Sequence, residues 1–225
     1  MKISSRTRLL LGFTLANTAI ALVAAALFFN RPEPPPIIQG VLLTDGRPVQ
    51  EFSLLDHHGR HFSNRELLGQ WHLVSYGFTT CPDICPTTLS QLTVAAERLG
   101  DYREDLRVLF YSVDHRRDTV EQLAAYLPFF NEEFLGLTHV DDPRNPHLPF
   151  ETSLGIVARL QPNLEEGVVD PLDYQVQHGV TLFLLNPSGE LQAIFEPDQV
   201  APGVHAYNPD TLVADYLAVR RYLEG

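Results

Sequence analysis

Sulfur is scarce in this chain of 225 residues, which contains two cysteines and one methionine. Two cysteines cannot build a scaffold of several disulfides, and they cannot complete a tetrahedral metal site made of cysteine alone. The methionine is Met1, so no thioether is present in the rest of the sequence. A metal bound by both cysteines must therefore take its further ligands from other residue types.

Positive charge is also scarce. The chain has 16 Lys and Arg residues against 28 Asp and Glu residues, a formal net charge of −12 with the histidines neutral. Because such a surface repels a polyanion, we expect no nucleic acid among the partners. Internal repeats and low-complexity segments are missing as well, and 44% of the residues are apolar. These features favour one continuous domain with a substantial core.

An apolar run without charge, from Leu9 to Phe29, follows Lys2, Arg6 and Arg8 near the N-terminus. As a helix it spans about 30 Å, the thickness of the hydrocarbon core of a bilayer. A cleaved signal sequence is the alternative, but its apolar region is shorter. We therefore expect residues 1–30 to be a membrane anchor.

The basic residues before this run set its orientation. By the positive-inside rule they hold the N-terminus in the cytoplasm, so the rest of the chain crosses the membrane. We expect a single-pass protein of the inner (cytoplasmic) membrane whose C-terminal domain lies in the periplasm. Residues 31–40 begin with Arg-Pro-Glu-Pro-Pro-Pro, which predicts a stiff, proline-rich linker, and residues 41–225 form the expected domain.

Strand and helix patterns alternate after the linker. We expect a hairpin from Phe52–Leu55 and Arg60–Ser63, further strands at Trp71–Phe78, Leu106–Val113, within Phe134–Val140, Val180–Leu185 and Leu191–Phe195, and helices at Thr87–Leu99, Asp118–Leu127 and from Asn208 to Leu223. This order predicts an α/β fold: a thioredoxin-like mixed sheet flanked by helices, with an N-terminal β-hairpin extension and an N-terminal transmembrane helix.

Both cysteines lie in Thr80-Cys-Pro-Asp-Ile-Cys-Pro86, between a predicted strand and a predicted helix. The N-terminus of a helix favours anions, so a thiolate there is stabilised. Cys81 and Cys85 are therefore suited to redox chemistry or to a soft metal such as Cu(I), Zn(II) or an iron–sulfur unit.

Histidine is the leading third ligand for such a metal. Of the nine histidines, most are expected on the surface or in packing contacts. His178 differs, because it directly precedes the strand Val180–Leu185, and in a thioredoxin-like fold that junction faces the cysteine corner. His115 and His205 are weaker candidates.

Three motifs together resemble the Sco/SenC family: Gly77-Phe-Thr-Thr-Cys-Pro-Asp-Ile-Cys-Pro-Thr-Thr-Leu89, Ser112-Val-Asp-His-Arg-Arg-Asp-Thr119 and Asp173-Tyr-Gln-Val-Gln-His178. The resemblance runs from about Phe52 to the C-terminus. It implies a membrane-tethered copper chaperone that binds copper through Cys81, Cys85 and His178. The chemistry of these side chains agrees, because two thiolates and one neutral imidazole suit three-coordinate Cu(I), and the same set holds Cu(II) when water or another oxygen fills an open position. The resemblance also implies delivery of copper to, or maturation of, the CuA site of cytochrome c oxidase. The implied partners are subunit II of the oxidase or another cuproprotein, and a protein that donates the copper.

The sequence departs from the family pattern in two places. His115 stands where the family usually has proline, and the segment from Pro143 to Leu160 is rich in proline where a helix is expected. Asp114, sometimes considered an additional oxygen ligand in the family, is present, but a loop or helix-start carboxylate is the favoured interpretation.

Two other interpretations of the cysteine pair stay open. The first is a periplasmic thiol–disulfide oxidoreductase that acts through Cys81 and Cys85 and reduces the cysteines of a cuproprotein. The second is a structural disulfide. Copper is favoured because three residues separate the cysteines, where redox thioredoxins have two, and because Gln177-His178-Gly179 lacks the proline that thioredoxins place before this strand.

Overall fold

Helix α1, Ser5–Phe29, is the first element of the computed structural model, which describes residues 4–29, 34–139, 147–162 and 172–224. Its segment Leu9–Phe29 has a mean hydropathy of 2.0 and is long and apolar enough to cross a membrane, although a signal sequence passes the same test. The chain divides into two units, Met1–Pro35 and Pro36–Gly225. Residues 31–33 of the predicted linker lie outside the described residues.

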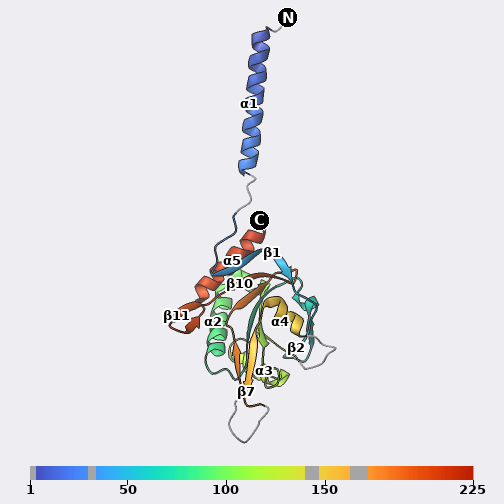
Figure 1. The fold of residues 1–225 in the computed structure, drawn as a ribbon, viewed down its shortest axis with the longest axis vertical. Coiled ribbons are helices and arrows are strands. Elements are labelled where there is room, and N and C mark those ends of the chain that lie inside the picture. Colours follow the sequence, from blue (N-terminus) through green and yellow to red (C-terminus); the bar gives the residue numbers. More distant parts are fainter. Residues whose placement is uncertain (1–3, 30–33, 140–146, 163–171, 225) are drawn as a thin grey trace. The chain divides into compact units, whose positions relative to one another are not determined.

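A mixed sheet of eight strands forms the centre of the second unit (Figure 1). Its strand order is β1-β10-β9-β4-β5-β6-β2-β3, with β4, β5 and β6 parallel to one another and the other pairs antiparallel. The strands are β1 Gly40–Pro48, β2 Ser53–Asp56, β3 His61–Ser63, β4 Trp71–Gly77, β5 Leu106–Ser112, β6 Leu135–Thr138, β9 Leu182–Leu185 and β10 Glu190–Phe195.

Helices cover both faces of this sheet because its central strands are apolar on both sides. Helices α2, α3 and α5 share one core cluster with strand residues such as Leu73 and Phe110, whereas α4 shares the second with Val74 and Tyr111. Burying one such large side chain stabilises the fold by roughly 1.5–3 kcal/mol. The α-helices are α2 Ile84–Arg98, α3 Val120–Tyr126, α4 Leu148–Leu154 and α5 Pro209–Glu224, and the 3₁₀ turns are Asn64–Leu67, Gly100–Asp105 and Leu127–Phe129.

The predicted α/β class and mixed sheet are thus confirmed, as is the β2–β3 hairpin. Ser63 and Glu66 form a capping box, and the element that follows is a 3₁₀ turn. Helix α3 begins at Val120, two residues after the predicted start at Asp118. Thr119 caps α3 by accepting a hydrogen bond from the backbone N–H of Gln122, because the Asp118 carboxylate is engaged elsewhere.

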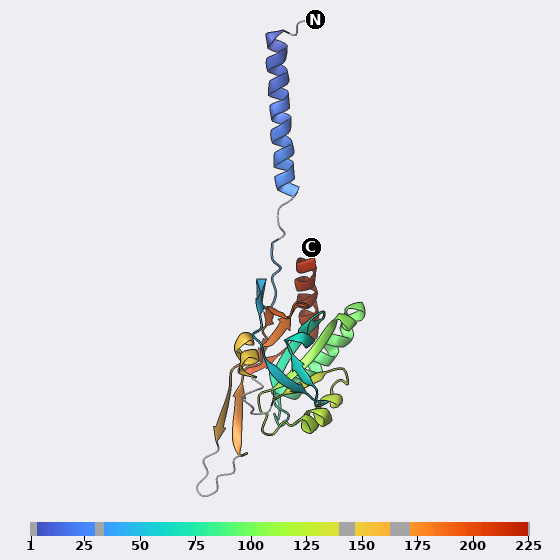
Figure 2. The same cartoon turned by 90° about the vertical axis from the view of Figure 1, so that its right-hand side faces the viewer.

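Five further strands complete the described part of the chain. Strand β1 pairs with β10 at the edge of the sheet. Two separate hairpins are formed by β7 Ala158–Pro162 with β8 Tyr174–His178, and by β11 Asp198–Ala201 with β12 Val204–Ala206. The β7–β8 hairpin extends away from the central sheet (Figures 1 and 2). His178 therefore ends a strand of its own, rather than simply preceding the strand that was predicted.

Candidate metal centre

The cysteine motif forms the corner between the central strand β4 and helix α2. The helix begins at Ile84, three residues before its predicted start, so Cys85 lies in its first turn and Cys81 lies in the loop before it. Backbone N–H groups in a first helical turn have no intrahelical partner and stabilise negative charge. The corner thus places the cysteine pair at the end of the helix that stabilises negative charge, as the sequence predicted.

Gly77, the last residue of β4, makes room for the Cys85 sulfur. A Cβ atom at position 77 would lie 2.5 Å from Cys85 Sγ, far inside van der Waals contact. Cys85 is consequently buried, with 4% of its surface exposed, whereas Cys81 is half-buried. Both cysteines are free. Because Cys81 is the more exposed of the two, its sulfur is the one that solvent or a partner reaches.

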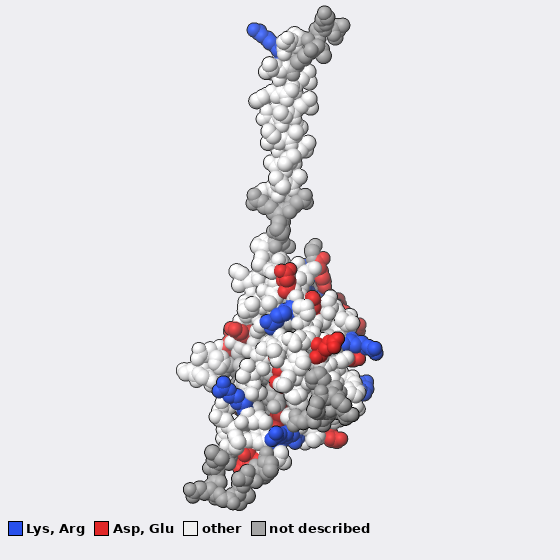
Figure 3. All heavy atoms as spheres, turned by 45° about the vertical axis from the view of Figure 1, so that its right-hand side comes forward, with Lys and Arg blue, Asp and Glu red and all other residues white. Residues whose placement is uncertain are grey.

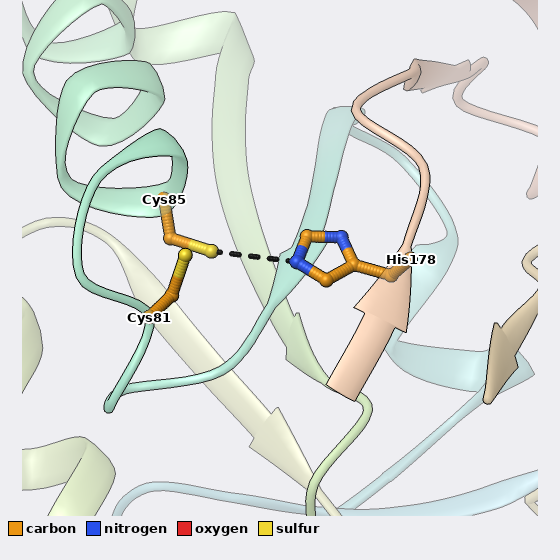
Figure 4. A group of neighbouring side chains, drawn as sticks. All are labelled: Cys81, Cys85 and His178. Atoms are coloured by element: carbon orange, nitrogen blue, oxygen red, sulfur yellow. Dashed lines mark hydrogen bonds between the residues drawn. The ribbon is translucent and has the colours of Figure 1, made fainter. Parts of the chain in front are cut away.

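His178 faces the two sulfurs from the end of β8 (Figure 4). Its Nε2 atom lies 3.7 Å from Cys85 Sγ, and its Nδ1 atom lies 2.6 Å from the carbonyl oxygen of Gly179. A proton on Nδ1 is donated to that carbonyl, which leaves the lone pair of Nε2 directed at the sulfurs. Gly179 is needed beside it, because a Cβ there would lie 2.5 Å from the Tyr76 hydroxyl.

Two aromatic rings restrict the His178 imidazole. The rings of Tyr76 and Phe78 each stand edge-on to it, with centroids 5.6 Å away. Both residues come from β4 or its immediate end, so the strand that leads to the cysteines also packs against the histidine. This packing limits the orientations of the imidazole, and a metal ligand that is held in place before binding loses less entropy.

Together, Cys81, Cys85 and His178 offer ligand atoms that all lie within 4.8 Å of one another. No other group of three His, Cys, Asp or Glu residues in the described part of the chain meets this criterion. His205 lies on the exposed strand β12, and His115 packs against other histidines. The structure thus brings together the three residues that the sequence predicted as ligands and leaves the two weaker candidates outside.

The two sulfurs differ in charge state. The pKa of Cys81 is lowered, mainly because its sulfur accepts a hydrogen bond from the Cys85 thiol, and further because it accepts hydrogen bonds from the backbone N–H groups of Asp83 and Cys85. The pKa of Cys85 is raised, because its proton is held by Cys81 and because the residue is buried. In the absence of metal, the pair therefore shares one proton, with the negative charge on the more exposed Cys81.

Asp118 fixes the loop that leads to the cysteines, a role that the sequence did not indicate. Its buried carboxylate accepts hydrogen bonds from the backbone N–H and hydroxyl of Thr79, at 2.9 and 2.6 Å, and from the hydroxyl of Ser112 at 2.6 Å. Burial raises the pKa of this carboxyl group. The ends of β4 and β5 are thereby joined two residues before Cys81.

Asp114 is also outside the ligand group. Its buried carboxylate accepts hydrogen bonds from the Tyr174 hydroxyl and from the guanidinium of Arg117, the latter at 2.5 Å. Arg117 in turn donates to the Tyr174 carbonyl at 3.2 Å and lies over the Tyr174 ring. Since Tyr174 begins β8 and His178 ends it, Asp114 and Arg117 anchor the strand that carries the histidine.

The chemistry of the donor set fits a soft, low-coordinate metal. Thiolates select Cu(I) or Zn(II), and imidazole suits copper and zinc. Bonds of about 2.3 Å to sulfur in a trigonal arrangement place two sulfurs about 4 Å apart. The ligand atoms, all within 4.8 Å of one another, need only a small movement to reach that spacing.

Charges are dispersed on one face of the domain (Figure 3). In the face shown in Figure 3, acidic and basic side chains are interspersed over a largely uncharged surface, and no continuous basic patch is visible. Several basic groups are engaged in ion pairs, including Arg103 with Glu133 and Arg220 with Asp105.

Known proteins share this fold and this sequence pattern. The protein sco1 of Schizosaccharomyces pombe is 31% identical over 159 residues, which cover 69% of this chain and 58% of that protein. The chain spans about half the length of the vertebrate SCO1 and SCO2 relatives that it matches.

Solved structures of Sco proteins have a similar fold. Arabidopsis thaliana ScoI with copper bound aligns with a TM-score of 0.62 and 26% identity, over 76% of this chain and 96% of that one. BsSco, described as having a disulfide switch and as a member of the Sco family of cytochrome c oxidase assembly proteins, has the same fold, with a TM-score of 0.57 and 21% identity over 82% of this chain and 98% of that one. A family model described as SCO1/SenC matches residues 43–207, so the chain belongs to the SCO1/SenC family.

Proposed function

We propose that this protein is a membrane-tethered copper chaperone that delivers copper to, or matures, the CuA site of cytochrome c oxidase. The observation that carries the proposal is the convergence of Cys81, Cys85 and His178, with all ligand atoms within 4.8 Å of one another. The copper bound in solved structures of the family and the description of the Sco family as oxidase assembly proteins support it.

Copper is the cargo in this proposal, and the three side chains hold it. Two thiolates and one imidazole leave a fourth coordination position open, and Cys81 and His178 are both only half-buried. A ligand of the acceptor protein can therefore enter at the exposed side, while the buried Cys85 still holds the ion from the protein interior. Transfer then proceeds by exchange of ligands, without a covalent intermediate between the two proteins.

The helix α1 is the proposed membrane anchor. Its apolar segment Leu9–Phe29 is long enough to span a bilayer, and basic residues precede it. We place the protein in the inner (cytoplasmic) membrane as a single-pass protein, with residues 31–40 as a linker and residues 41–225 as the domain in the periplasm. The intact mass of the protein purified from membranes distinguishes an anchor from a cleaved signal sequence.

Copper binding tests the ligand assignment directly. The reduced full-length protein in detergent is titrated with Cu(I) against a chromophoric competitor. We expect one tightly bound equivalent, which Cys81→Ser and Cys85→Ser abolish and His178→Ala weakens at least tenfold. His205→Ala, on the exposed strand β12, is the matched control and leaves the affinity unchanged. An unchanged affinity in His178→Ala contradicts the assignment.

Thiol–disulfide exchange is a second candidate function, favoured by the asymmetry of the two sulfurs. The lowered pKa of the half-buried Cys81 and the raised pKa of the buried Cys85 are typical of an attacking thiolate with a resolving partner. In this case the dithiol is oxidised to a disulfide while a disulfide of the acceptor protein is reduced. A His178→Ala strain separates the two functions: normal assembly of the oxidase favours reduction, and a loss of assembly favours copper delivery.

A further inference from the structure

The hydroxyl group of Tyr126, the last residue of α3, is buried and has no hydrogen-bond partner among the described residues. The buried hydroxyl of Tyr207, by contrast, donates to the carbonyl oxygens of Val180 and Phe195, at 2.8 and 2.9 Å. A buried hydroxyl without a partner costs free energy, and native structures contain few such groups. The position of the Tyr126 hydroxyl therefore requires a physical reason.

Two phenylalanine rings hold the Tyr126 ring in place. Its centroid lies 6.1 Å from that of Phe110, on β5, and 5.1 Å from that of Phe130. Side chains on a helix lean toward the helix N-terminus, so the Tyr126 ring leans back toward the start of α3. Asp118 lies two residues before that start and holds the loop that leads to the cysteines. The hydroxyl is thus on the side of α3 that faces the metal centre.

The Phe110 ring connects Tyr126 with the pocket of the buried sulfur. A Cβ atom at Gly77 would lie 2.5 Å from Cys85 Sγ and 3.4 Å from Cε2 of Phe110. The sulfur and the edge of this ring therefore flank the same glycine, and Tyr126 packs against the same ring. Burial raises the pKa of Tyr126, and a negative charge on Cys85 is the next largest cause. Cys85 is thus the charged group to which the hydroxyl is coupled most strongly.

The Cys85 sulfur needs a further donor once it holds a metal. Cys85 is 4% exposed, and its sulfur accepts a hydrogen bond from the backbone N–H of Phe78. In the dithiol, Cys85 donates its own proton to Cys81. A metal takes the place of that proton, and the sulfur is then a buried thiolate that water hardly reaches. Hydrogen bonds to such a charged group are the strong ones.

Asp118 is the other acceptor on this side of α3. Its carboxylate already accepts three hydrogen bonds, two from Thr79 and one from Ser112. A fourth donor adds little to a carboxylate that is satisfied in this way. The sulfur, with fewer donors, gains more from the tyrosine hydroxyl.

We infer that the Tyr126 hydroxyl donates a hydrogen bond to the Cys85 sulfur when the cysteines hold copper, and that Tyr126 is a positioning residue of the metal centre. The inference rests on the function proposed above. It explains the unpaired hydroxyl, because the donor waits for a thiolate that forms only on binding. No hydrogen bond joins the hydroxyl to the sulfur in the present structure, so a small movement of the ring or of the sulfur accompanies binding.

The variant Tyr126→Phe tests this, because it keeps the ring and removes the hydroxyl. The reduced full-length protein in detergent is titrated with Cu(I) against a chromophoric competitor, and the metal-free protein is unfolded with urea. We expect the dissociation constant of Cu(I) to rise about tenfold, since a hydrogen bond to a charged group is lost. The metal-free variant is expected to be at least as stable as the wild type, since its unpaired hydroxyl is gone. A tyrosine with a purely structural role has the opposite effect on both measurements.

An absorption spectrum reports the hydrogen bond itself. A donor to the thiolate stabilises the sulfur electrons, so its loss in the Cu(II)-loaded variant is expected to move the sulfur-to-copper charge-transfer band to longer wavelength. Tyr216→Phe is the matched control, because Tyr216 is a buried tyrosine of the same core cluster whose hydroxyl accepts from Arg220 at 3.5 Å. This control leaves the band and the copper affinity unchanged.

The outcomes separate this inference from the proposed function. An affinity and a band in Tyr126→Phe that equal those of the wild type overturn the inference. A less stable metal-free Tyr126→Phe with unchanged copper binding also overturns it and assigns the hydroxyl to Asp118 or to the core. Failure of the wild type itself to bind copper contradicts the proposed function instead.

Discussion

The substitution Gly77→Ala tests how tightly the fold positions the buried sulfur. The added Cβ would lie 2.5 Å from Cys85 Sγ, whereas ordinary contacts are 3.4–4 Å, so the two atoms must separate by about 1 Å or more. Strand β4 cannot retreat easily, because it pairs with β5 and β9 and the carbonyl of Gly77 accepts the N–H of Val113 at 2.9 Å. The sulfur must therefore move away from its present position.

A movement of this size is large for a metal ligand, since ligand distances in metal sites hold to within about 0.2 Å. We expect the dissociation constant of Cu(I) to rise at least 100-fold, which corresponds to about 2.7 kcal/mol. The assay is competition with a Cu(I) chelator, with circular dichroism to verify folding. Gly136→Ala is the matched control: its Cβ would lie 2.6 Å from a side-chain carbon of Leu127, away from the cysteines, so it lowers stability but leaves copper affinity intact. A folded Gly77→Ala protein whose affinity stays within threefold of the wild type refutes the reasoning.

Three other substitutions test the surroundings of the site and the core. Burial and the charge of Arg107 lower the pKa of His72 to about 4, so between that pH and 6.5 the unfolded chain binds a proton that the native chain does not. Because of this residue, the free energy of unfolding is expected to fall by about 2 kcal/mol from pH 7 to pH 5. His72→Leu should remove this pH dependence, which is measured by urea unfolding with Trp71 fluorescence as the signal. Asp118→Asn leaves at least one of the three donors from Thr79 and Ser112 unsatisfied. We therefore expect the free energy of unfolding, measured with urea, to fall by about 1–3 kcal/mol, and competition with a Cu(I) chelator to show weaker Cu(I) binding. Gly179→Ala should weaken Cu(I) binding by driving its Cβ against the Tyr76 hydroxyl, and adding Tyr76→Phe should restore it; failure of this rescue assigns the effect to another cause.

The cysteine corner could be predicted because its signals are local. An apolar strand, a cysteine pair flanked by prolines and an amphipathic helix follow one another in the sequence, and the structure keeps that order. His178 was found by the same kind of reasoning, although it belongs to β8 and not to the approach to β9. The short segment Tyr174–His178 has a partner only in β7, and such a two-stranded hairpin has no strong pattern of its own.

The supporting contacts could not be predicted, because they depend on tertiary structure. Asp118 stands next to Thr119 at the start of a helix, where either residue is a suitable cap. Asp118 accepts hydrogen bonds from Thr79 and Ser112 only because the ends of β4 and β5 lie side by side. Similarly, the stacking of His115, His139 and His147 requires three elements to meet. Contacts between residues far apart in the sequence produce no repeating pattern of apolar and polar residues, so a single sequence does not reveal them.

The two candidate functions use the same two sulfurs, so one molecule cannot perform both at the same moment. A disulfide between Cys81 and Cys85 removes both thiolates, and His178 alone cannot retain Cu(I) against competing thiols. A molecule that has reduced the cysteines of its partner is therefore unable to carry copper until it is reduced again. Because the exposed Cys81 holds the negative charge while the buried Cys85 holds the proton, both attack on a disulfide and capture of an ion begin at the same atom. If both proposed functions hold, we therefore expect the partner that reaches Cys81 first, an oxidised acceptor or a copper donor, to decide which function a given molecule performs.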